Sequence, residues 1–405
     1  MRRLLFLAHR IPYPPDKGEK IRAFHILEHL SKRFAVELGC LVDDPADMRH
    51  LPALASRVAA LEAHLLPGGA RAYLRALARL RPGEPLTRGW FHSPLLDSWV
   101  RHGLEAGRYD AVFVYSSAMA PYVMGRPRRP ADQIRVLDLV DVDSQKFAAY
   151  AAAPSGLLGE LMAWVHAREA RTLLGLERAA AAAFDRTFLV SEEEASLLRS
   201  LAPEVAGKIE ALENGVDFAR FDPTAEFPNP FEHPGPHIVF TGAMGYRPNI
   251  EAVTWFAEAV LPLLAASPPM PAFHIVGANP APSVRALGSR PGVYVTGTVP
   301  DVRPYLARAD VVVAPLLTAR GIQNKVLEAM AMARPVVATP QAFEGVRAEP
   351  GRDLLVASGA EAFAEAVASV LSGAHPGLGL RARAAMRAGH DWAATLAPLA
   401  RVLPG

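Results

Sequence analysis

Short apolar runs alternate along the chain with longer segments rich in Ala, Leu and Arg. This alternation is typical of parallel β-strands joined by crossover helices, so the pattern predicts an α/β protein. Strands are predicted in the first half at residues 4–8, 36–42, 111–115, 134–140 and 187–190, and in the second half at residues 237–242, 273–277, 293–296, 311–314, 335–338 and 354–356.

A proline-rich stretch separates the two sets of strands. Residues 222–236, DPTAEFPNPFEHPGP, hold five prolines and predict a linker without regular structure. The length of 405 residues suits two domains. We expect a Rossmann-like domain over 1–221, a second over 237–380, and a helical segment over 381–405 that can pack back on the first domain. Two such doubly wound sheets should face a central cleft at the carboxyl ends of their strands.

Charge and cysteine content exclude several classes of protein. A formal net charge of +2 gives no broad basic surface, so nucleic acid is not an expected partner. The single cysteine, Cys40, excludes an internal disulfide framework and agrees with a cytoplasmic protein. The thirteen histidines show no H-E-x-x-H motif or paired spacing. We therefore expect no metal and no cofactor.

Two stretches bear on membrane contact. The start, MRRLLFLAHRIPYPP, resembles a signal peptide, but its apolar run ends after five residues at His9 and Arg10, which predicts a buried first strand. No run approaches the roughly 18 apolar residues of a membrane helix. Arg71, Arg75 and Arg79 lie four residues apart in RAYLRALARLRPGEP. This spacing fits a basic helix on the inner face of a membrane and equally fits an ordinary surface helix.

One glutamate stands in a helix that otherwise looks built for burial, RGIQNKVLEAMAMARPVVAT. Arg320 and Gly321 should open this helix at the carboxyl edge of the sheet, where free backbone N–H groups favour an anion. Asn324, Lys325 and Glu328 share one helical face by their spacing.

This face predicts a nucleoside diphosphate site. A phosphate near Arg320 and Lys325 would place Glu328 one turn deeper, about 5 Å along the axis. A carboxylate there can accept hydrogen bonds from two vicinal ribose hydroxyls. The alternative is that Glu328 merely pairs with Lys325 on a solvated face.

The loop PYPPDKGEK follows the first predicted strand. Its Gly18 permits close backbone approach to a ligand, and Lys17 and Lys20 stand beside it. A solvated Pro-Gly turn is the alternative. The loop lacks the G-x-G-x-x-G spacing, which argues against a dinucleotide oxidoreductase.

The chain resembles retaining glycosyltransferases of the GT-B fold, in the family called GT4. The resemblance rests on NKVLEAMAMARPVVAT, ENGVD at residues 213–217, GTVPDVRPYLARADVVVAPL and GRDLLVA, and it spans nearly the whole chain. The stretches FLAHRIPYPPDKGEKIRAFHILEHL, VDDPADMRHLPAL, VYSSAMAPY and LVDVDSQKFAAYA are similar to the subfamily of sugar transferases associated with PEP-CTERM/exosortase exopolysaccharide systems.

The resemblance implies a metal-independent enzyme of the hexosyltransferase type. It would move a sugar from a nucleotide-sugar donor to a growing or lipid-linked glycan, with retention of anomeric configuration. The C-terminal domain would hold the nucleotide, and the acceptor would enter from the N-terminal domain. The loop with Gly18 resembles the family's glycine loop, which closes on the diphosphate.

On the donor side the chain departs from the family pattern. Relatives often have two glutamates eight positions apart, of which Glu328 matches the second, while Arg320 takes the place of the first and is assigned to phosphate. Relatives also often carry an Arg and a Lys after the first strand of the second domain, where FTGAMGYRPN offers Arg247 alone. Val299, in the GTVPD stretch, is assigned to the donor as well.

On the acceptor side, the histidine that commonly ends a first-domain strand is replaced by Ser116 and Ser117, so Ser117 is a catalytic candidate. Asp141 and Asp143 follow another predicted strand and could orient an acceptor hydroxyl or act as a base. The alternative is that they cap the next helix. His9 is placed similarly, although a lone histidine near a strand end is usually structural.

Two further functions stay open from the sequence. A nucleotide-sugar-binding scaffold without catalysis would explain the missing glutamate and histidine. A nucleotide-sugar epimerase on the same fold would convert the donor without any acceptor.

Overall fold

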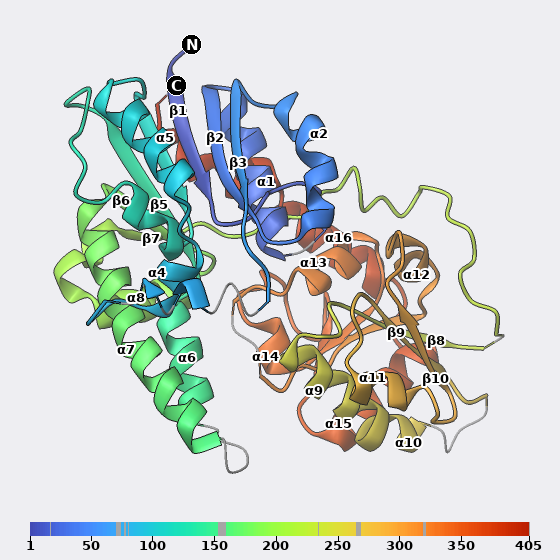
Figure 1. The fold of residues 1–405 in the computed structure, drawn as a ribbon. Helices are drawn as coiled ribbons and strands as arrows, with labels where there is room; N and C mark the ends of the chain where they lie inside the picture. The colour runs from blue at the N-terminus through green and yellow to red at the C-terminus, as the bar shows by residue number, and fades with distance from the viewer. Residues whose placement is uncertain are drawn as a thin grey trace. The chain divides into compact units, whose positions relative to one another are not determined.

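The computed structural model describes residues 1–405 except 17, 70–73, 77, 80, 153–158, 234, 265–268, 319–320 and 405. The chain divides into two compact units (Figure 1). The first comprises Met1–Glu213 and Leu396–Gly405, and the second comprises Asn214–Thr395. The last residues of the chain therefore group with the first unit.

A seven-stranded parallel sheet forms the centre of the first unit, in the order β3-β2-β1-β4-β5-β6-β7. Its strands are β1 Arg3–Ala8, β2 Ala35–Val42, β3 Ala60–Leu65, β4 Ala111–Tyr115, β5 Ile134–Val140, β6 Arg186–Leu189 and β7 Ile209–Ala211. β1 and β4 are buried along nearly their whole length, because helices cover both faces of the sheet.

Within the described residues, the helices of the first unit are α1 Gly18–Ser31, α2 Leu51–Ala55, α4 Leu86–Trp90, α5 Pro94–Glu105, α6 Asp143–Ala152, α7 Gly159–Ala183, α8 Glu192–Leu201 and α18 Ala397–Val402. Three 3₁₀ turns add η1 Pro45–His50, η2 Ser117–Tyr122 and η3 Pro203–Lys208. α6 and α7 run side by side (Figure 1), where Phe147 and Tyr150 pack on His166.

The second unit holds a six-stranded parallel sheet in the order β10-β9-β8-β11-β12-β13. Its strands are β8 His237–Thr241, β9 Ala272–Val276, β10 Val293–Gly297, β11 Val311–Ala314, β12 Val336–Ala338 and β13 Leu355–Val356. Its helices are α9 Arg247–Trp255, α10 Leu261–Leu264, α11 Pro282–Leu287, α12 Arg303–Arg308, α13 Asn324–Ala331, α14 Pro340–Phe343, α15 Ala360–Leu371, α16 Leu378–Gly389 and α17 Trp392–Thr395, and a π-helical turn, Phe256–Val260, joins α9 to α10.

The structure confirms the α/β class and every predicted strand to within one residue at each end. Two strands were not predicted. β3 carries Glu62 and His64 and is half-exposed at the sheet edge, so it lacks an apolar run. β7 has three residues, too few to show a pattern. Residues 222–236 contain no helix or strand in their described part.

Each sheet reverses its strand order at one point. In the first, the chain runs from β1 outward to β3 and then crosses to β4 on the other side of β1. In the second, it runs from β8 outward to β10 and then crosses to β11. In open α/β sheets, ligands bind outside the carboxyl ends of the strands at such switch points. The ends of β1 and β4, and of β8 and β11, are therefore the places to search for a site.

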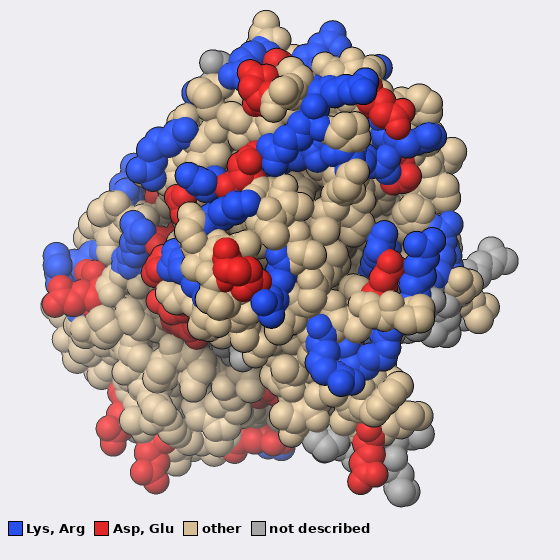
Figure 2. Space-filling view, turned by 90° about the vertical axis from the view of Figure 1, so that its left-hand side faces the viewer, with Lys and Arg blue, Asp and Glu red and all other residues tan. Residues whose placement is uncertain are grey.

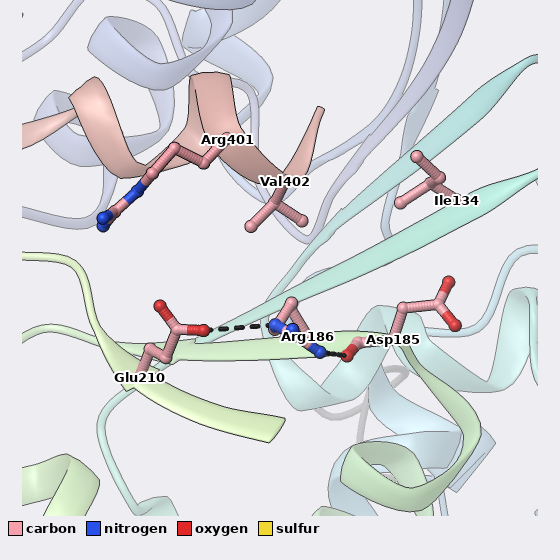
Figure 3. A pocket seen from close by; sticks show the side chains of 6 residues that line it. All are labelled: Ile134, Asp185, Arg186, Glu210, Arg401 and Val402. Atoms are coloured by element: carbon pink, nitrogen blue, oxygen red, sulfur yellow. Dashed lines mark hydrogen bonds and ion pairs between the residues drawn. The ribbon is translucent and has the colours of Figure 1, made fainter. Parts of the chain in front are cut away.

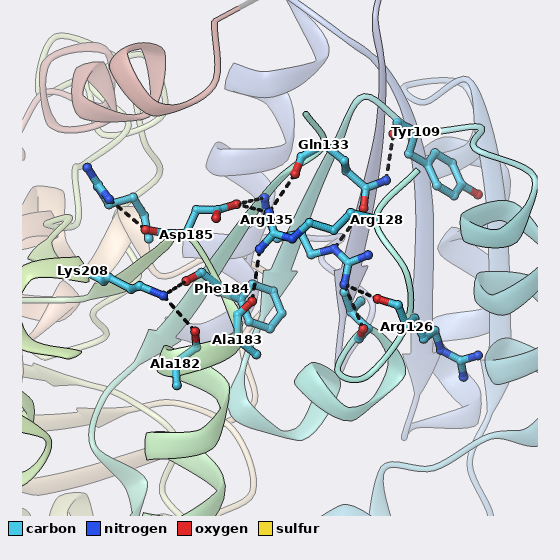
Figure 4. A network of polar contacts seen from close by, with 12 residues as sticks. Tyr109, Arg126, Arg128, Gln133, Arg135, Ala182, Ala183, Phe184, Asp185 and Lys208 are labelled. Atoms are coloured by element: carbon cyan, nitrogen blue, oxygen red, sulfur yellow. Dashed lines mark hydrogen bonds and ion pairs between the residues drawn. The ribbon is translucent and has the colours of Figure 1, made fainter. Parts of the chain in front are cut away.

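A buried arginine fixes the opposite, amino-terminal end of the first sheet (Figure 4). Arg135 is 4% exposed and donates to Gln133 Oε1 at 2.9 Å and to the Pro127 carbonyl at 2.7 Å. Burial lowers the pKa of Arg135 to about 10. Its partners are neutral, so this arginine ties the loop before β5 to the sheet and is a structural residue.

Among the described residues, no helix has the length and apolar character needed to cross a membrane. Basic and acidic side chains are interspersed on the face turned to the viewer in Figure 2, in keeping with the net charge of +2.

Candidate functional site

A half-buried lysine lies at the switch point of the second sheet. Lys325, in the first turn of α13, donates from Nζ to Asn249 Oδ1 at 2.5 Å. The same Nζ lies 4.4 Å from the centre of the Phe240 ring in β8, a cation–π contact. A Cβ at Gly242 would stand 3.3 Å from Nζ and 2.8 Å from Asn249 Nδ2. Glycine at this position therefore leaves the room that the lysine head group uses.

The amide of Asn249 joins this lysine to the loop after β8. Asn249 lies in the first turn of α9, is 5% exposed, and donates from Nδ2 to the Ala243 carbonyl at 2.9 Å. Met244 N donates to the Ala278 carbonyl at 2.8 Å, which fixes the other side of the loop. The loop and the lysine are thus held by one side chain. This role was not predicted, because Asn249 and Lys325 are 76 residues apart in the sequence.

α13 carries the polar face that the sequence predicts. Asn324, Lys325 and Glu328 are half-buried, while Val326 and Leu327 are buried in the core of the unit. The helix begins at Asn324, four residues later than predicted. Gly321 has φ 66°, a left-handed conformation that a helix cannot include, and it is buried just before the helix.

Glu328 and Lys325 form no ion pair within 4.0 Å in the described part of the chain, and Lys325 instead faces Asn249. Burial raises the pKa of Glu328 to about 7, against the opposing charges of Arg220 and Lys325. Burial lowers the pKa of Lys325 to about 7, against the charge of Glu328. An acid and a base with pKa values shifted toward neutrality by burial are typical of functional sites.

The ENGVD segment approaches the start of α13 and is anchored by a buried histidine. His390 is fully buried and donates from Nδ1 to the Asn214 carbonyl at 3.0 Å, while its Nε2 accepts from Arg347 N at 2.9 Å. Val216 N donates to the His390 carbonyl at 2.8 Å. The Asn214 amide then donates to Asn324 Oδ1 at 3.0 Å. His390 is therefore a structural residue that sets the position of this segment.

Arg220 is a cation that the sequence reasoning missed. Asp217 Oδ1 accepts from the backbone N of Ala219 and of Arg220, both at 3.0 Å, which forms a tight turn. Arg303 Nη1 donates to the Arg220 carbonyl at 3.2 Å. The backbone of Arg220 is thus fixed, and its charge acts on Glu328. The signal was present in the sequence, three residues after ENGVD.

The other predicted donor residues are spread over several places. Arg247 begins α9, is exposed, and pairs with Glu251 at 2.7 Å. Val299 is half-buried in the loop after β10 and packs on the core of the second unit. Gly18 is the exposed first residue of α1. Arg320 and Lys17 lie outside the described residues.

In the loop of Gly18, the neighbouring Lys20 is 2% exposed and donates to Asp47 Oδ2 at 2.7 Å. The charge of Lys20 is therefore paired with Asp47 inside the first unit.

Asp141 and Asp143 are brought together at the carboxyl end of β5. Lys146 Nζ contacts Asp141 Oδ2 at 2.7 Å and Asp143 Oδ1 at 3.0 Å. Although burial lowers it, the pKa of Lys146 lies above its usual range because Asp143 and Asp141 outweigh that effect. The start of α6 is capped by Glu177, which accepts from Ser144 N at 3.1 Å and from Ser144 Oγ at 2.6 Å. The two aspartates therefore pair with Lys146, and the start of α6 is capped by Glu177 instead.

Ser117 begins η2 directly after β4 and is 3% exposed. Ser116 before it has φ 84° and caps this turn through its side chain, which accepts from Ala118 N at 3.3 Å.

In the basic stretch, Arg71 lies outside the described residues. Arg75 donates to the Trp90 carbonyl at 2.7 Å and so faces its own unit. In the described part of the chain, no group of three or more His, Cys, Asp or Glu is placed to hold a metal ion.

A surface hollow of about 460 Å³ lies at the amino-terminal ends of β5 and β6, lined by Ile134, Asp185, Arg186, Glu210, Arg401 and Val402 (Figure 3). Arg186 pairs there with Glu210 at 3.1 Å. Because ligands of such sheets bind at the carboxyl ends, this hollow is not the predicted site.

A known protein family matches part of the second unit. Residues 235–373 match the family model described as glycosyl transferases group 1. The matched range includes Gly242, Asn249, Lys325 and Glu328, so the cluster described above lies within it. No curated protein sequence matches the chain significantly.

Solved structures are similar over the whole chain. A sucrose-phosphate synthase from Thermosynechococcus elongatus has a TM-score of 0.71 at 16% identity and covers 99% of this chain and 98% of its own. HepE of Anabaena, in complex with UDP and glucose, has a TM-score of 0.64 at 15% identity and covers 100% of both chains. WaaG, a glycosyltransferase involved in lipopolysaccharide biosynthesis, has a TM-score of 0.65 at 14% identity and covers 99% of this chain and 100% of its own. These likenesses show the two-domain, Rossmann-like GT-B fold.

Proposed function

We propose that the protein is a retaining glycosyltransferase of family GT4 that moves a sugar from a nucleotide-sugar donor to a growing or lipid-linked glycan. The observation that carries this proposal is the cluster of Lys325, Asn249 and Glu328 at the switch point of the second sheet. It combines a fixed cation with a carboxylate inside the range that matches glycosyl transferases group 1.

Each member of the cluster has a role in holding the donor. Lys325 supplies the positive charge for the diphosphate, and Gly242 lets the backbone of the loop after β8 come close to it. Glu328 lies one turn further along α13 and accepts hydrogen bonds from the ribose hydroxyls. The lysine charge takes over the neutralisation that a metal gives in other enzymes, and the proposal includes no metal and no cofactor.

The comparisons favour a uridine nucleotide as the first donor to test. HepE has been solved with UDP and with UDP-glucose, and WaaG acts in lipopolysaccharide biosynthesis. We extend the proposal to exopolysaccharide or capsule assembly of the PEP-CTERM/exosortase type, on the cytoplasmic side and in peripheral contact with the membrane. The basis for this extension is the resemblance of the first-unit stretches.

A scaffold that binds a nucleotide sugar without transferring the sugar is the second candidate. It is favoured by the pairing of both Asp141 and Asp143 with Lys146, which leaves neither carboxylate as a ready base. Transfer of the sugar to an acceptor separates the two candidates, since a scaffold binds donor without forming product.

A thermal-unfolding panel of nucleotide sugars tests the proposal. A ligand at 100 times its dissociation constant stabilises the folded state by about 2.7 kcal/mol. We expect one nucleotide class to raise the unfolding midpoint well above the others. Transfer to a glycan acceptor with that donor should follow. A panel in which no nucleotide or nucleotide sugar stabilises the protein would reject the donor site.

The Asn249 amide should matter for binding although we assign it no contact with the donor. We expect Asn249→Ala to weaken UDP binding about fivefold, because Lys325 loses the acceptor that fixes its direction, at roughly the cost of one hydrogen bond. Calorimetric titration with UDP measures the effect. Uridine, which has no phosphate for Lys325 to contact, should bind Asn249→Ala as it binds the parent; an equal loss for UDP and uridine would show that Asn249 only stabilises the fold.

The affinity for UDP should depend on pH with a maximum near pH 7. Lys325 loses its charge above a pKa of about 7, and Glu328 becomes protonated below a pKa of about 7, so binding weakens on both sides. Calorimetric titrations with UDP at pH values from about 5.5 to about 8.5 measure how the affinity depends on pH. Lys325→Met should remove the alkaline limb and Glu328→Gln the acidic one. A flat profile in the parent protein would contradict the assignment of both groups.

A further inference from the structure

His9 occupies the switch point of the first sheet. It directly follows β1, whose last residue, Ala8, pairs with Tyr115 at the end of β4. The His9 ring stacks on the Tyr115 ring with centroids 5.8 Å apart and an interplanar angle of 15°. The Phe91 ring meets it edge-on at 5.3 Å. Two aromatic side chains thus fix the plane of the imidazole at the edge where ligands of such sheets bind.

One ring nitrogen of His9 is not used by the fold. Nδ1 is buried and has no hydrogen-bond partner in the described part of the chain. A buried polar atom without a partner costs about 1–3 kcal/mol, so native structures rarely keep one without a reason. A histidine with a purely structural role looks different in this same protein. His390 uses both ring nitrogens, one toward Asn214 and the other toward Arg347.

The surroundings make His9 a neutral group. Burial, and next the charge of Arg10, lower the pKa of His9 to about 4, so the ring carries no charge at neutral pH. The nearby charges are already balanced, since Arg10 pairs with Glu19 at 2.7 Å and with Asp43 at 2.8 Å. A neutral imidazole has one nitrogen that donates and one that accepts. Its natural partner is a hydroxyl group rather than an anion.

Backbone strain marks the same edge. Ser116, next to Tyr115, has φ 84° and ψ 143°, a conformation that costs a residue with a side chain about 1–3 kcal/mol. Such strain clusters at ligand sites. The other candidate groups of this edge are engaged, Asp141 and Asp143 with Lys146.

We propose that His9 binds a hydroxyl group of the carbohydrate acceptor, with Tyr115 and Phe91 holding the ring in place. The ligand class is a neutral sugar, because a neutral imidazole beside aromatic rings suits hydroxyl groups on an apolar ring face. That this sugar is the acceptor of the transfer rests on the proposed function. The binding of a sugar at His9 can be tested separately.

The first test observes the ring itself. Histidine side chains are labelled with ¹³C and ¹⁵N, and the full-length protein is titrated with methyl α-glucoside, methyl α-mannoside and methyl α-galactoside. We expect a saturable shift of the His9 signals with at least one glycoside and no shift of His166, which packs on Phe147 and Tyr150 in the same unit. The His9→Phe spectrum assigns the signal. Absence of any His9 shift, or an equal shift at His166, overturns the proposal.

The second test compares activity with stability. His9→Phe keeps an aromatic ring against Tyr115 and removes the buried nitrogen, so its unfolding midpoint should equal or exceed that of the parent. Transfer to acceptor should fall about tenfold, as for one lost hydrogen bond, while UDP affinity is unchanged. His166→Phe is the matched control and should keep full transfer. A destabilised His9→Phe, or one with full transfer, shows that His9 is structural.

The two proposals fail in different ways. If the parent protein neither binds nucleotide sugars nor transfers a sugar but His9 responds to glycosides, the proposed function is wrong and the sugar site stands. If transfer is robust and His9 shows no response, the enzyme stands and the role of His9 is wrong.

Discussion

Replacing Lys325 with methionine is expected to weaken UDP binding roughly 10- to 100-fold, which corresponds to the ~1.5–3 kcal/mol of a hydrogen bond to a charged group. Binding of uridine should be nearly unchanged, because the lysine faces the phosphates and not the nucleoside. Methionine fills a similar volume beside Phe240 and Gly242 without a charge. Calorimetric titrations with UDP and with uridine measure both affinities.

The same substitution should make the protein more stable. Burial holds the pKa of Lys325 at about 7 instead of 10.5, so the folded state disfavours the charged form. The unfolded chain binds more protons between pH 7 and 10.5, and the penalty from this group declines as the pH rises through that window. Lys325→Met removes the penalty, which urea unfolding at pH 7 detects.

Arg290→Met is the matched control for this cation. Arg290 is in the same unit, is exposed, and pairs with Glu258 at 2.6 Å. It should change neither UDP affinity nor stability by more than a surface pair does, about 1 kcal/mol at most. Equal losses for UDP and uridine in Lys325→Met would show that this lysine does not contact phosphate.

Glu328→Gln is expected to weaken binding of UDP and of uridine by a similar factor, roughly 10- to 100-fold. Both ligands carry the ribose, whose hydroxyls donate hydrogen bonds to the carboxylate. Glutamine keeps the size of the side chain and one acceptor oxygen but loses the charge. Deoxyuridine, which lacks one of the two hydroxyls, should bind the parent weakly and lose less on substitution. Calorimetry with the three ligands gives the comparison.

Glu328→Gln should be more stable than the parent protein, although it binds its ligands more weakly. Burial holds the pKa of Glu328 at about 7 instead of 4.5, so stability declines as the pH rises from 4.5 to 7 and the carboxylate is forced to ionise. Glu328→Gln should therefore unfold at a higher temperature than the parent at pH 8. Glu258→Gln, at an exposed carboxylate, is the control for both measurements. Unchanged affinity for all three ligands in Glu328→Gln would show that this carboxylate does not contact the ribose.

The two substitutions share a physical basis. Lys325 and Glu328 are held in surroundings that disfavour their charges, although neither pairs with the other. A side chain that lowers the stability of the free protein is retained when a ligand supplies its partner. This is why the ligand assays and the unfolding assays should change in opposite senses for both variants.

The sequence by itself determined the elements of this protein and part of its site. Strand positions follow from short apolar runs bounded by turns, which are local features, and they agree with the structure to within one residue. The shared face of Asn324, Lys325 and Glu328 follows from helical spacing, which is local too. β3 was missed because Glu62 and His64 interrupt its apolar pattern at a half-exposed edge.

Only the tertiary structure decided which partners these side chains have. Lys325 meets Asn249 from 76 residues away, and His390 holds the ENGVD segment from 176 residues away. No periodicity records such contacts, because they arise when strands distant in sequence become neighbours in a sheet. The burial that shifts the pKa of Lys325, Glu328 and His9 arises in the same way, since it depends on what the whole unit packs around each group.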